Sequence, residues 1–211
     1  MSFRTATQSQ SPLDFSQKEL IDLAIAWVVL SVAFALLMSP IHLGMVSVGA
    51  FVVMTGLSFV TVGVAFLLHE LAHKVVAIHF GQTAEFRADY QMLFLAVMSA
   101  LVGFLFAAPG AVYHRGRITT RENGLIALAG PLTNHALALL LFPLLLFGPG
   151  VFALIGHMGI LINLFLAAFN MIPFGPLDGK SVWNWNKAVF AVVFTLSVVL
   201  LLGFFLVFGF W

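Results

Sequence analysis

Long apolar runs alternate with short polar stretches along most of this chain. A helix needs about 20 predominantly apolar residues to cross the roughly 30 Å of bilayer hydrocarbon. Five runs reach that length, at about 21–39, 48–73, 124–147, 151–172 and 188–210. They predict an all-α polytopic membrane protein in which 20–211 form a single membrane-embedded domain. Residues 1–19 are polar, lack the apolar core of a signal peptide, and are expected to form an N-terminal tail.

A sixth apolar stretch, about 92–112, is either an ordinary sixth span or a hairpin that enters and leaves on one side. The nine basic residues are Arg4, Lys18, Lys74, Arg87, Arg115, Arg117, Arg121, Lys180 and Lys187. If 92–112 returns to the side it entered, all nine lie on one side, and an excess of Lys and Arg marks the cytoplasm. A full crossing would move three of the arginines outside. We therefore predict five to six transmembrane helices, with a re-entrant or membrane-associated hairpin at 92–112 favoured over a sixth span.

Composition narrows the class of protein further. Hydrophobic residues make up 62% of the 211 and charged residues only 8%, whereas soluble domains carry about 25% charged residues. This excludes a water-soluble enzyme and a disordered chain. The net charge of +1 gives no case for nucleic-acid binding, and the absence of Cys excludes disulfides, Cys–zinc sites and thiol catalysis.

Two histidines four positions apart lie near the end of the second apolar run, where residues 66–74 read FLLHELAHK. His69 and His73 differ by about 40° around a helix and share one face. Two imidazoles at this spacing can bind one zinc ion, and Glu70 beside them can act as general base. Ionisable groups within an apolar helix are functional candidates by default. The alternative is that the helix has left the membrane at Lys74 and that both histidines are interfacial.

A third ligand can be sought by elimination. Catalytic zinc usually has three protein ligands and one open position, and without Cys the third must be Asp, Glu or another His. Asp178 is the only carboxylate after Glu122, and it lies in NMIPFGPLDGK at the end of an apolar run. Pro173 and Pro176 prevent a regular helix there, so the backbone can turn a carboxylate back toward the histidines. The alternative is a solvated turn at a helix end, for which Pro, Asp and Gly are ordinary residues.

The remaining histidines are weaker candidates. His79 lies about 240° around the helix from His73 and faces elsewhere. His42 and His114 fall in loops, and packing or interfacial roles are favoured for His135 and His157, which lie near the ends of apolar runs.

Three short motifs follow one another along the chain: HELAH at 69–73, GPLTN at 130–134 and NMIPFGPLDG at 170–179. In order and rough spacing they resemble the site-2 protease family of intramembrane zinc metalloproteases. That family carries HExxH in one span, Gly-Pro-x-x-Asn at the opening of an intervening span and an NxxPxxxxDG-like motif in a later one. The resemblance covers about 45–180 and fits a compact form without PDZ or CBS domains.

The resemblance implies a role for each matched residue. His69, His73 and Asp178 would bind one Zn²⁺ ion. Glu70 would activate the zinc-bound water as general base. Asn170 is similar to the family residue that contacts the substrate or stabilises the oxyanion.

For two further features the resemblance leaves two alternative roles each. Asn134 is similar to a polar residue of the central span that supports the site or binds substrate, or it makes only a packing hydrogen bond between helices. The stretch 92–112 resembles a membrane-associated segment placed beside the substrate in some members. It could hold an extended substrate by strand addition, or it could simply contact lipid.

The implied function is regulated intramembrane proteolysis: hydrolysis of a peptide bond within or near the span of a single-span membrane protein. The alternative is a membrane zinc-binding protein or carrier without protease activity. The expected partners are the substrate and the lipid bilayer, with no nucleic acid, and the sequence leaves the oligomeric state open. A prokaryotic cell membrane is weakly favoured, with the active site toward the cytoplasmic side.

Overall fold

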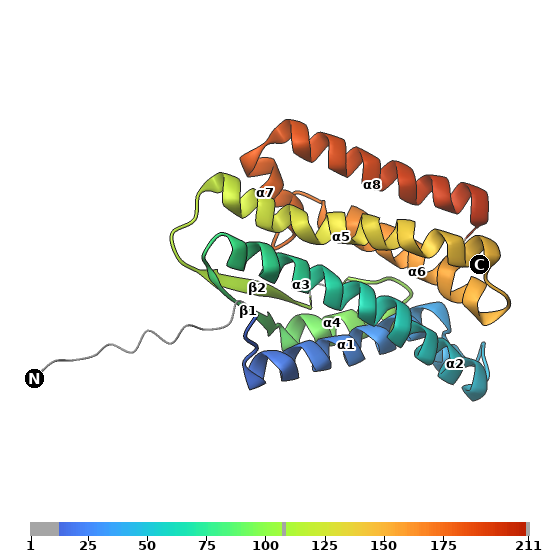
Figure 1. Ribbon diagram of the computed structural model, residues 1–211. Coiled ribbons are helices and arrows are strands. Elements are labelled where there is room, and N and C mark those ends of the chain that lie inside the picture. The colour runs from blue at the N-terminus through green and yellow to red at the C-terminus, as the bar shows by residue number, and fades with distance from the viewer. Residues whose placement is uncertain (1–12, 107–108, 210–211) are drawn as a thin grey trace, which may run out of the picture.

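Five helices dominate the computed structural model, which describes residues 13–106 and 109–209. Each is long and apolar enough to cross a membrane, so the all-α polytopic prediction is confirmed. The spans are α1 (Gln17–Met38), the continuous helix Val48–His79, α5 (Thr120–Phe147), α6 (Val151–Asn170) and α8 (Lys187–Phe208). They lie side by side, with α1 and α4 on one flank, α8 on the other, and α3, α5 and α6 between them (Figure 1).

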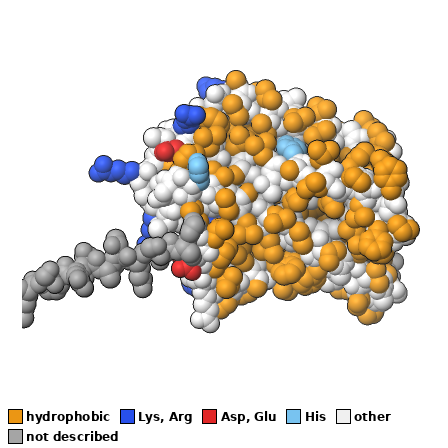
Figure 2. Space-filling view, viewed as in Figure 1, with side chains coloured by type: hydrophobic (Ala, Val, Ile, Leu, Met, Phe, Trp, Pro, Cys, Tyr) orange, Lys and Arg blue, Asp and Glu red, His pale blue; other side chains and the backbone are white. Residues whose placement is uncertain are grey.

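The surface agrees with a membrane position. In Figure 2, hydrophobic side chains cover most of the visible face, while Lys, Arg, Asp and Glu gather at the end of the molecule where the N-terminal trace emerges. This is also the end at which the short two-stranded sheet lies in Figure 1. The helical bundle therefore has one charged end and a long apolar body.

The first helix begins earlier than the predicted polar tail allows. Residues 1–12 of that tail lie outside the described residues, but α1 starts at Gln17, where the Ser16 side chain accepts a hydrogen bond from the backbone N–H of Glu19. Glu19 and Asp22 are 0% and 1% exposed. Polar residues continue the helix here because both carboxylates accept hydrogen bonds from the backbone of the neighbouring strand, and each has a further partner, Lys74 of α3 for Glu19 and Tyr90 of the next helix for Asp22.

The stretch 92–112 forms the predicted hairpin, since the chain that enters it and the chain that leaves it lie in two paired strands. Helix α4 (Tyr90–Leu101) has 12 residues, a length of about 18 Å that is too short to cross the hydrocarbon. Strands β1 (Thr83–Ala88) and β2 (Gly110–Arg115) flank the hairpin and pair antiparallel, with Ala88 opposite Gly110. These two strands were not predicted from the sequence.

The span Val48–His79 is not uniform along its length. It consists of α2 (Val48–Ser58), a π-helical turn η2 (Phe59–Gly63) and α3 (Val64–His79). Trp27 of α1 packs on this turn, and its indole Nε1 donates to the Phe59 carbonyl at 2.9 Å. A Cβ on Gly63 would lie 1.6 Å from that nitrogen. A glycine and a π-turn, which often marks a functional site, thus allow α1 to approach the helix that carries HELAH.

The chain between the last two spans is short and irregular, as the prolines predicted. Helix α6 ends at Asn170, and the next helix, α7 (Asp178–Trp185), begins at Asp178. Trp185 packs against Gly124 of α5, where an added Cβ would lie 2.5 Å from the Cβ of Trp185 and 2.7 Å from its indole ring. Helix α7 is therefore seated on α5, and its first residue is held near the bundle interior. A short 3₁₀ helix, η1 (Ile41–Leu43), links α1 to the second span.

Candidate metal centre

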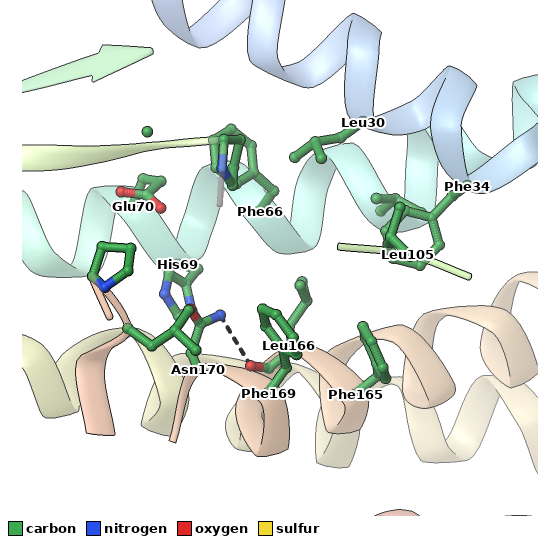
Figure 3. Close-up of a pocket in the computed structure, with 15 residues that line it drawn as sticks. Leu30, Phe34, Phe66, His69, Glu70, Leu105, Phe165, Leu166, Phe169 and Asn170 are labelled. Atoms are coloured by element: carbon green, nitrogen blue, oxygen red, sulfur yellow. Dashed lines mark hydrogen bonds between the residues drawn. The ribbon is translucent and has the colours of Figure 1, made fainter. Parts of the chain in front are cut away.

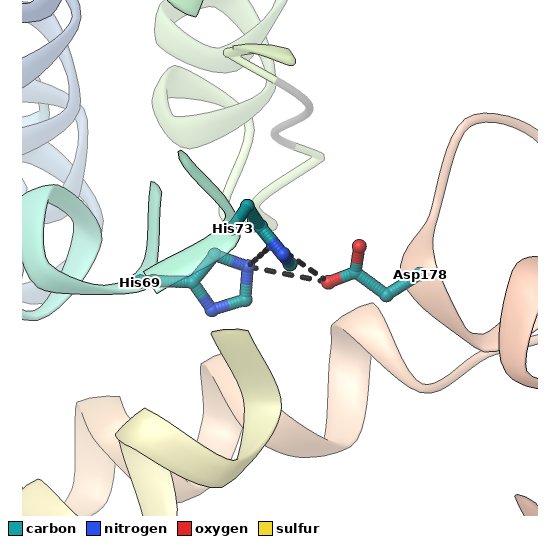
Figure 4. Close-up of side chains that lie close together, drawn as sticks. All are labelled: His69, His73 and Asp178. Atoms are coloured by element: carbon teal, nitrogen blue, oxygen red, sulfur yellow. Dashed lines mark hydrogen bonds and ion pairs between the residues drawn. The ribbon is translucent and has the colours of Figure 1, made fainter. Parts of the chain in front are cut away.

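His69, His73 and Asp178 converge at one point inside the bundle (Figure 4). The Oδ2 atom of Asp178 lies 3.2 Å from Nε2 of His69 and 3.4 Å from Nε2 of His73. The two Nε2 atoms are 3.0 Å apart. Both histidine side chains are buried, and that of Asp178 is 17% exposed. His73 and Asp178, 105 positions apart in sequence, therefore belong to one cluster.

The hydrogen bonds around His69 determine which ring nitrogen carries the proton. The amide nitrogen of Asn134 donates to Asn163 Oδ1 at 2.8 Å and faces the Ala65 carbonyl at 3.4 Å. Its Oδ1 therefore faces Nδ1 of His69, 2.6 Å away, as an acceptor. Nδ1 of His69 must donate in this contact, so Nε2 of the neutral ring presents a lone pair to the cluster.

The same argument applies to His73. Its Nδ1 lies 2.7 Å from the backbone carbonyl of Ile126 on α5, which can only accept. In the neutral ring, Nε2 of His73 therefore also presents a lone pair, and Asp178 adds a carboxylate oxygen that has no other hydrogen-bond partner among the described residues. Three acceptors facing one another at 3.0–3.4 Å repel one another unless a cation lies between them.

The cluster has the size and chemistry that zinc requires. Zinc binds imidazole nitrogen and carboxylate oxygen at about 2.0–2.2 Å in a tetrahedral arrangement, which separates neighbouring ligand atoms by about 3.3–3.6 Å. The observed separations of 3.0, 3.2 and 3.4 Å are within this range or slightly below it. Two imidazoles and one carboxylate also leave the fourth position free, as catalytic zinc sites do. In such sites a histidine ligand typically donates a hydrogen bond from its other ring N–H to a fixed acceptor.

Gly130 of α5 forms the wall behind this space. A Cβ at this position would lie 2.5 Å from Nε2 of His69 and 2.6 Å from Nε2 of His73. Any side chain would fill the volume in which the ligand atoms meet. The site itself therefore requires glycine at the first position of GPLTN on steric grounds, in addition to any requirement of helix packing.

The unwound segment between α6 and α7 delivers Asp178. Gly175 has φ +62, a left-handed conformation that suits glycine. A Cβ on Gly179 would lie 2.1 Å from the Met171 carbonyl oxygen, so the start of α7 can approach the end of α6 only with glycine there. The sequence predicted that the prolines break the helix, and the glycines complete the path that turns the carboxylate inward.

Glu70 lies next to the cluster and opens on a pocket of about 50 Å³. Its Oε2 atom is buried and has no hydrogen-bond partner among the described residues. The pocket wall is apolar on both sides, from α1 and α3 and from the end of α6, and the hairpin contributes Pro109 and Gly110 (Figure 3). A free carboxylate beside the candidate metal position is placed to exchange a proton with water.

The other predicted site residues occupy different positions. Asn170 lines the same pocket, but its amide nitrogen donates to the Leu166 carbonyl of its own helix at 3.0 Å (Figure 3). Asn134 does more than hold two helices together, since it contacts His69 directly.

Asn163, buried in α6, was missed by the sequence interpretation. An amide in the middle of an apolar run was the signal that could have found it. The His135 ring points to Ser197 of α8 instead.

Fold and site together define a multi-pass membrane protein with a buried two-histidine, one-carboxylate cluster suited to a metal ion. The chain is 45% identical over 201 residues to "Putative zinc metalloprotease MJ0611" of Methanocaldococcus jannaschii, covering 93% of this chain and 97% of that protein. It therefore belongs to the family of that protein. A second relative, "Putative zinc metalloprotease YwhC" of Bacillus subtilis, is 32% identical over 57% of this chain and 64% of its own length. No family model and no solved structure matches the chain. These relatives and the apolar helices indicate a membrane metalloprotease.

Proposed function

We propose that the protein is an intramembrane zinc protease of the site-2 type, which hydrolyses a peptide bond within or near the span of a membrane-anchored protein. The observation that carries this proposal is the convergence of His69, His73 and Asp178 beside an unpartnered Glu70 carboxylate. His69, His73 and Asp178 would hold one zinc ion. When bound, zinc supplies a Lewis acid that polarises a carbonyl oxygen and lowers the pKa of a coordinated water to about 7.

Glu70 performs the proton transfers in this mechanism. Its carboxylate accepts a proton from the attacking water as the water oxygen bonds to the scissile carbonyl carbon. It then donates that proton to the amide nitrogen as the C–N bond breaks, which releases a carboxylic acid and an amine. Because Glu70 Oε2 has no competing hydrogen-bond partner within the described residues, it is available for both steps. Asn170, on the pocket wall, would donate to substrate after releasing the Leu166 carbonyl.

The pocket and the adjacent strand suit an apolar, extended substrate. Phe34, Phe66, Leu105, Phe165 and Phe169 are among the pocket residues, so the site favours apolar side chains. A helical substrate hides its carbonyl groups in backbone hydrogen bonds and must be extended before attack. Strand β2 begins at the pocket with Gly110, and strand addition to β2 would hold the opened segment in place.

The charged end of the bundle supports a cytoplasmic orientation for the site. The sheet lies at the end of the bundle (Figure 1) where charged side chains gather (Figure 2). Lys74, which directly follows His73, is joined to this sheet through Glu19. Cytoplasmic segments carry the excess of Lys and Arg. The catalytic cluster would thus receive water from the cytoplasmic side, in a cell membrane of a prokaryote.

The test is cleavage of a single-span model substrate by detergent-purified protein, with zinc quantified in each sample. Wild type, Glu70→Gln and Glu85→Gln are compared, the last being a matched loss of a half-buried carboxylate in β1, away from the cluster. We expect about one zinc per chain in all three and a loss of cleavage of about 100- to 10,000-fold in Glu70→Gln alone. Chelation should abolish cleavage, and re-addition of zinc should restore it. Full zinc occupancy without cleavage of any substrate would favour a zinc-binding protein or carrier, and absence of zinc would overturn the proposal.

A further inference from the structure

Two carboxylates of α1 occupy the outer edge of strand β1. The backbone N–H of Phe86 donates to Oε1 of Glu19 at 3.0 Å, and that of Ala88 donates to Oδ2 of Asp22 at 3.4 Å. Exposed strand edges normally offer unpaired N–H and C=O groups to another strand. Here side chains that are 0% and 1% exposed take the place of such a strand. This edge of the sheet is closed.

The pairing register then determines which groups of β2 remain open. In an antiparallel pair, residues alternate between facing the partner strand and facing away. Since Phe86 and Ala88 face α1, their opposite residues Val112 and Gly110 also direct their backbone groups away from β1. The Asp89 N–H, which bonds the Pro109 carbonyl at 2.9 Å, fits the same alternation. Within the described residues, no protein hydrogen bond meets the outward backbone groups of Val112.

The open edge starts at the candidate metal centre. Gly110, at the beginning of β2, lines the pocket together with His69 and Glu70. The sheet thus has one edge sealed by α1 and one edge whose first residue faces the site. A strand added to β2 would pass directly beside the cluster.

The seal on β1 is fixed to the helix that carries HELAH. Lys74 of α3 donates to Oε2 of Glu19 at 2.6 Å, so one carboxylate contacts both the strand and α3. Asp22 accepts a second hydrogen bond from the Tyr90 hydroxyl at 2.6 Å, at the start of α4. The sheet, the hairpin helix and α3 are therefore held in one relative position by two adjacent turns of α1.

We propose that Glu19 and Asp22 are positioning residues that determine which peptide bond of the substrate is cleaved. They occupy the outer edge of β1 and thereby fix the position of the open β2 edge relative to the metal cluster. This inference rests on the proposed protease function and on strand addition to β2. A shift of the sheet relative to α3 would bring a different peptide bond of the substrate to the site. Side chains alternate along a strand, so the preferred new site would lie two residues away.

The experiment maps cleavage products by mass spectrometry and measures KM and kcat for wild type, Asp22→Ala, Asp22→Asn and Tyr90→Phe, with zinc content measured for each. Asp22→Ala removes the acceptor of the Ala88 N–H, whereas Asp22→Asn keeps an acceptor oxygen. Tyr90→Phe removes a hydrogen bond from the same carboxylate but leaves the β1 edge sealed. Loss of one such hydrogen bond corresponds to about a fivefold change in an equilibrium constant, here that of substrate binding.

For Asp22→Ala we expect KM to rise about fivefold, with additional cleavage sites, unchanged zinc and kcat within about twofold of wild type. Asp22→Asn should restore the single site, and Tyr90→Phe should keep it. Cleavage by Asp22→Ala at the wild-type position alone and with wild-type KM would overturn the inference and leave the proposed function standing. Failure of zinc-loaded wild type to cleave would overturn both.

Discussion

Nδ1 of His69 lies 2.6 Å from Oδ1 of Asn134, so a side chain on α5 fixes the orientation of a histidine on α3. Asn134 is 0% exposed, and its amide nitrogen is held in turn by Asn163 of α6. Three spans are thereby joined behind one candidate ligand. A partner of this kind selects the ring nitrogen that faces the metal and adds to the affinity for it.

Replacement of Asn134 by Leu should therefore weaken zinc binding about 10- to 100-fold. His69 would lose the acceptor for Nδ1 and could present either ring nitrogen to the cluster. The measurement is competition between the protein and a zinc chelator of known affinity. His135→Leu is the matched control, since its ring is the next on the same helix but contacts Ser197 of α8. Equal zinc affinity in Asn134→Leu and wild type would show that this contact only packs helices.

Gly130→Ala should prevent zinc binding while leaving the helix intact. The added Cβ would lie 2.5 Å from Nε2 of His69, whereas Ala favours a helix over Gly by about 1 kcal/mol. Zinc content and thermal unfolding in detergent would be measured together. Gly203→Ala in α8 is the control, because a Cβ there meets nothing within 4 Å, and it should keep full zinc. Stoichiometric zinc in Gly130→Ala would contradict the assigned position of the metal.

Removing one partner of the buried ion pair Lys74–Glu19 should strongly lower the free energy of unfolding. The two side chains are 2% and 0% exposed, and removal of one partner from a buried pair costs about 3–5 kcal/mol because the other charge is left unpaired. We expect Glu19→Ala to lower the unfolding temperature strongly. The double variant Glu19→Leu with Lys74→Met should be much less destabilised, since no charge remains buried. Equal destabilisation of the single and double variants would show that the unpaired Lys74 charge is not the source of the cost.

The hydrogen bond from Tyr90 to Asp22 predicts a pH dependence in the alkaline range. Donation to the Asp22 carboxylate raises the pKa of the Tyr90 phenol above its ordinary value, which is about 10. The stabilisation that this bond gives is therefore fully present below the ordinary pKa and is lost as the pH rises through the folded-state pKa.

The chain has two tyrosines, so Tyr113→Phe leaves Tyr90 as the only one to titrate. Ultraviolet absorbance of tyrosinate should rise at higher pH in folded Tyr113→Phe than in the same protein unfolded. Asp22→Asn in this background should shift the titration toward the ordinary value. Identical curves for the folded and unfolded protein would contradict the contact.

The apolar runs predicted the spans well, because bilayer thickness imposes a length that few other structures share. The prolines at 173 and 176 likewise predicted the helix break before Asp178. Strands β1 and β2 were not predicted, since β1 is a short segment whose outer edge is satisfied by Glu19 and Asp22, residues far away in sequence. The first helix was predicted to begin too late because Glu19, which is buried in the structure, lies in a polar stretch of sequence that is typical of a tail.

For the site, spacing alone was sufficient to select His69, His73 and Glu70, because a helix fixes the direction of neighbouring side chains. Asp178 required elimination, and its approach to the histidines depends on glycines whose close contacts only the structure shows. Asn163 and the Ile126 carbonyl act through contacts between helices. No local pattern in the sequence encodes such contacts, so they could not be predicted.

The π-helical turn at Phe59–Gly63 also constrains how the length of this chain can change. Such a turn holds one residue more than a regular turn, and one residue corresponds to about 100° of rotation along a helix. Deleting a single residue within this turn would remove the extra residue and leave a regular helix, so HELAH would keep its orientation relative to α2, whereas the same deletion elsewhere in the span would rotate HELAH by about 100°. In a related sequence without this turn, a one-residue gap should therefore fall within 59–63, and insertions or deletions elsewhere in α3 should be incompatible with a metal-binding face.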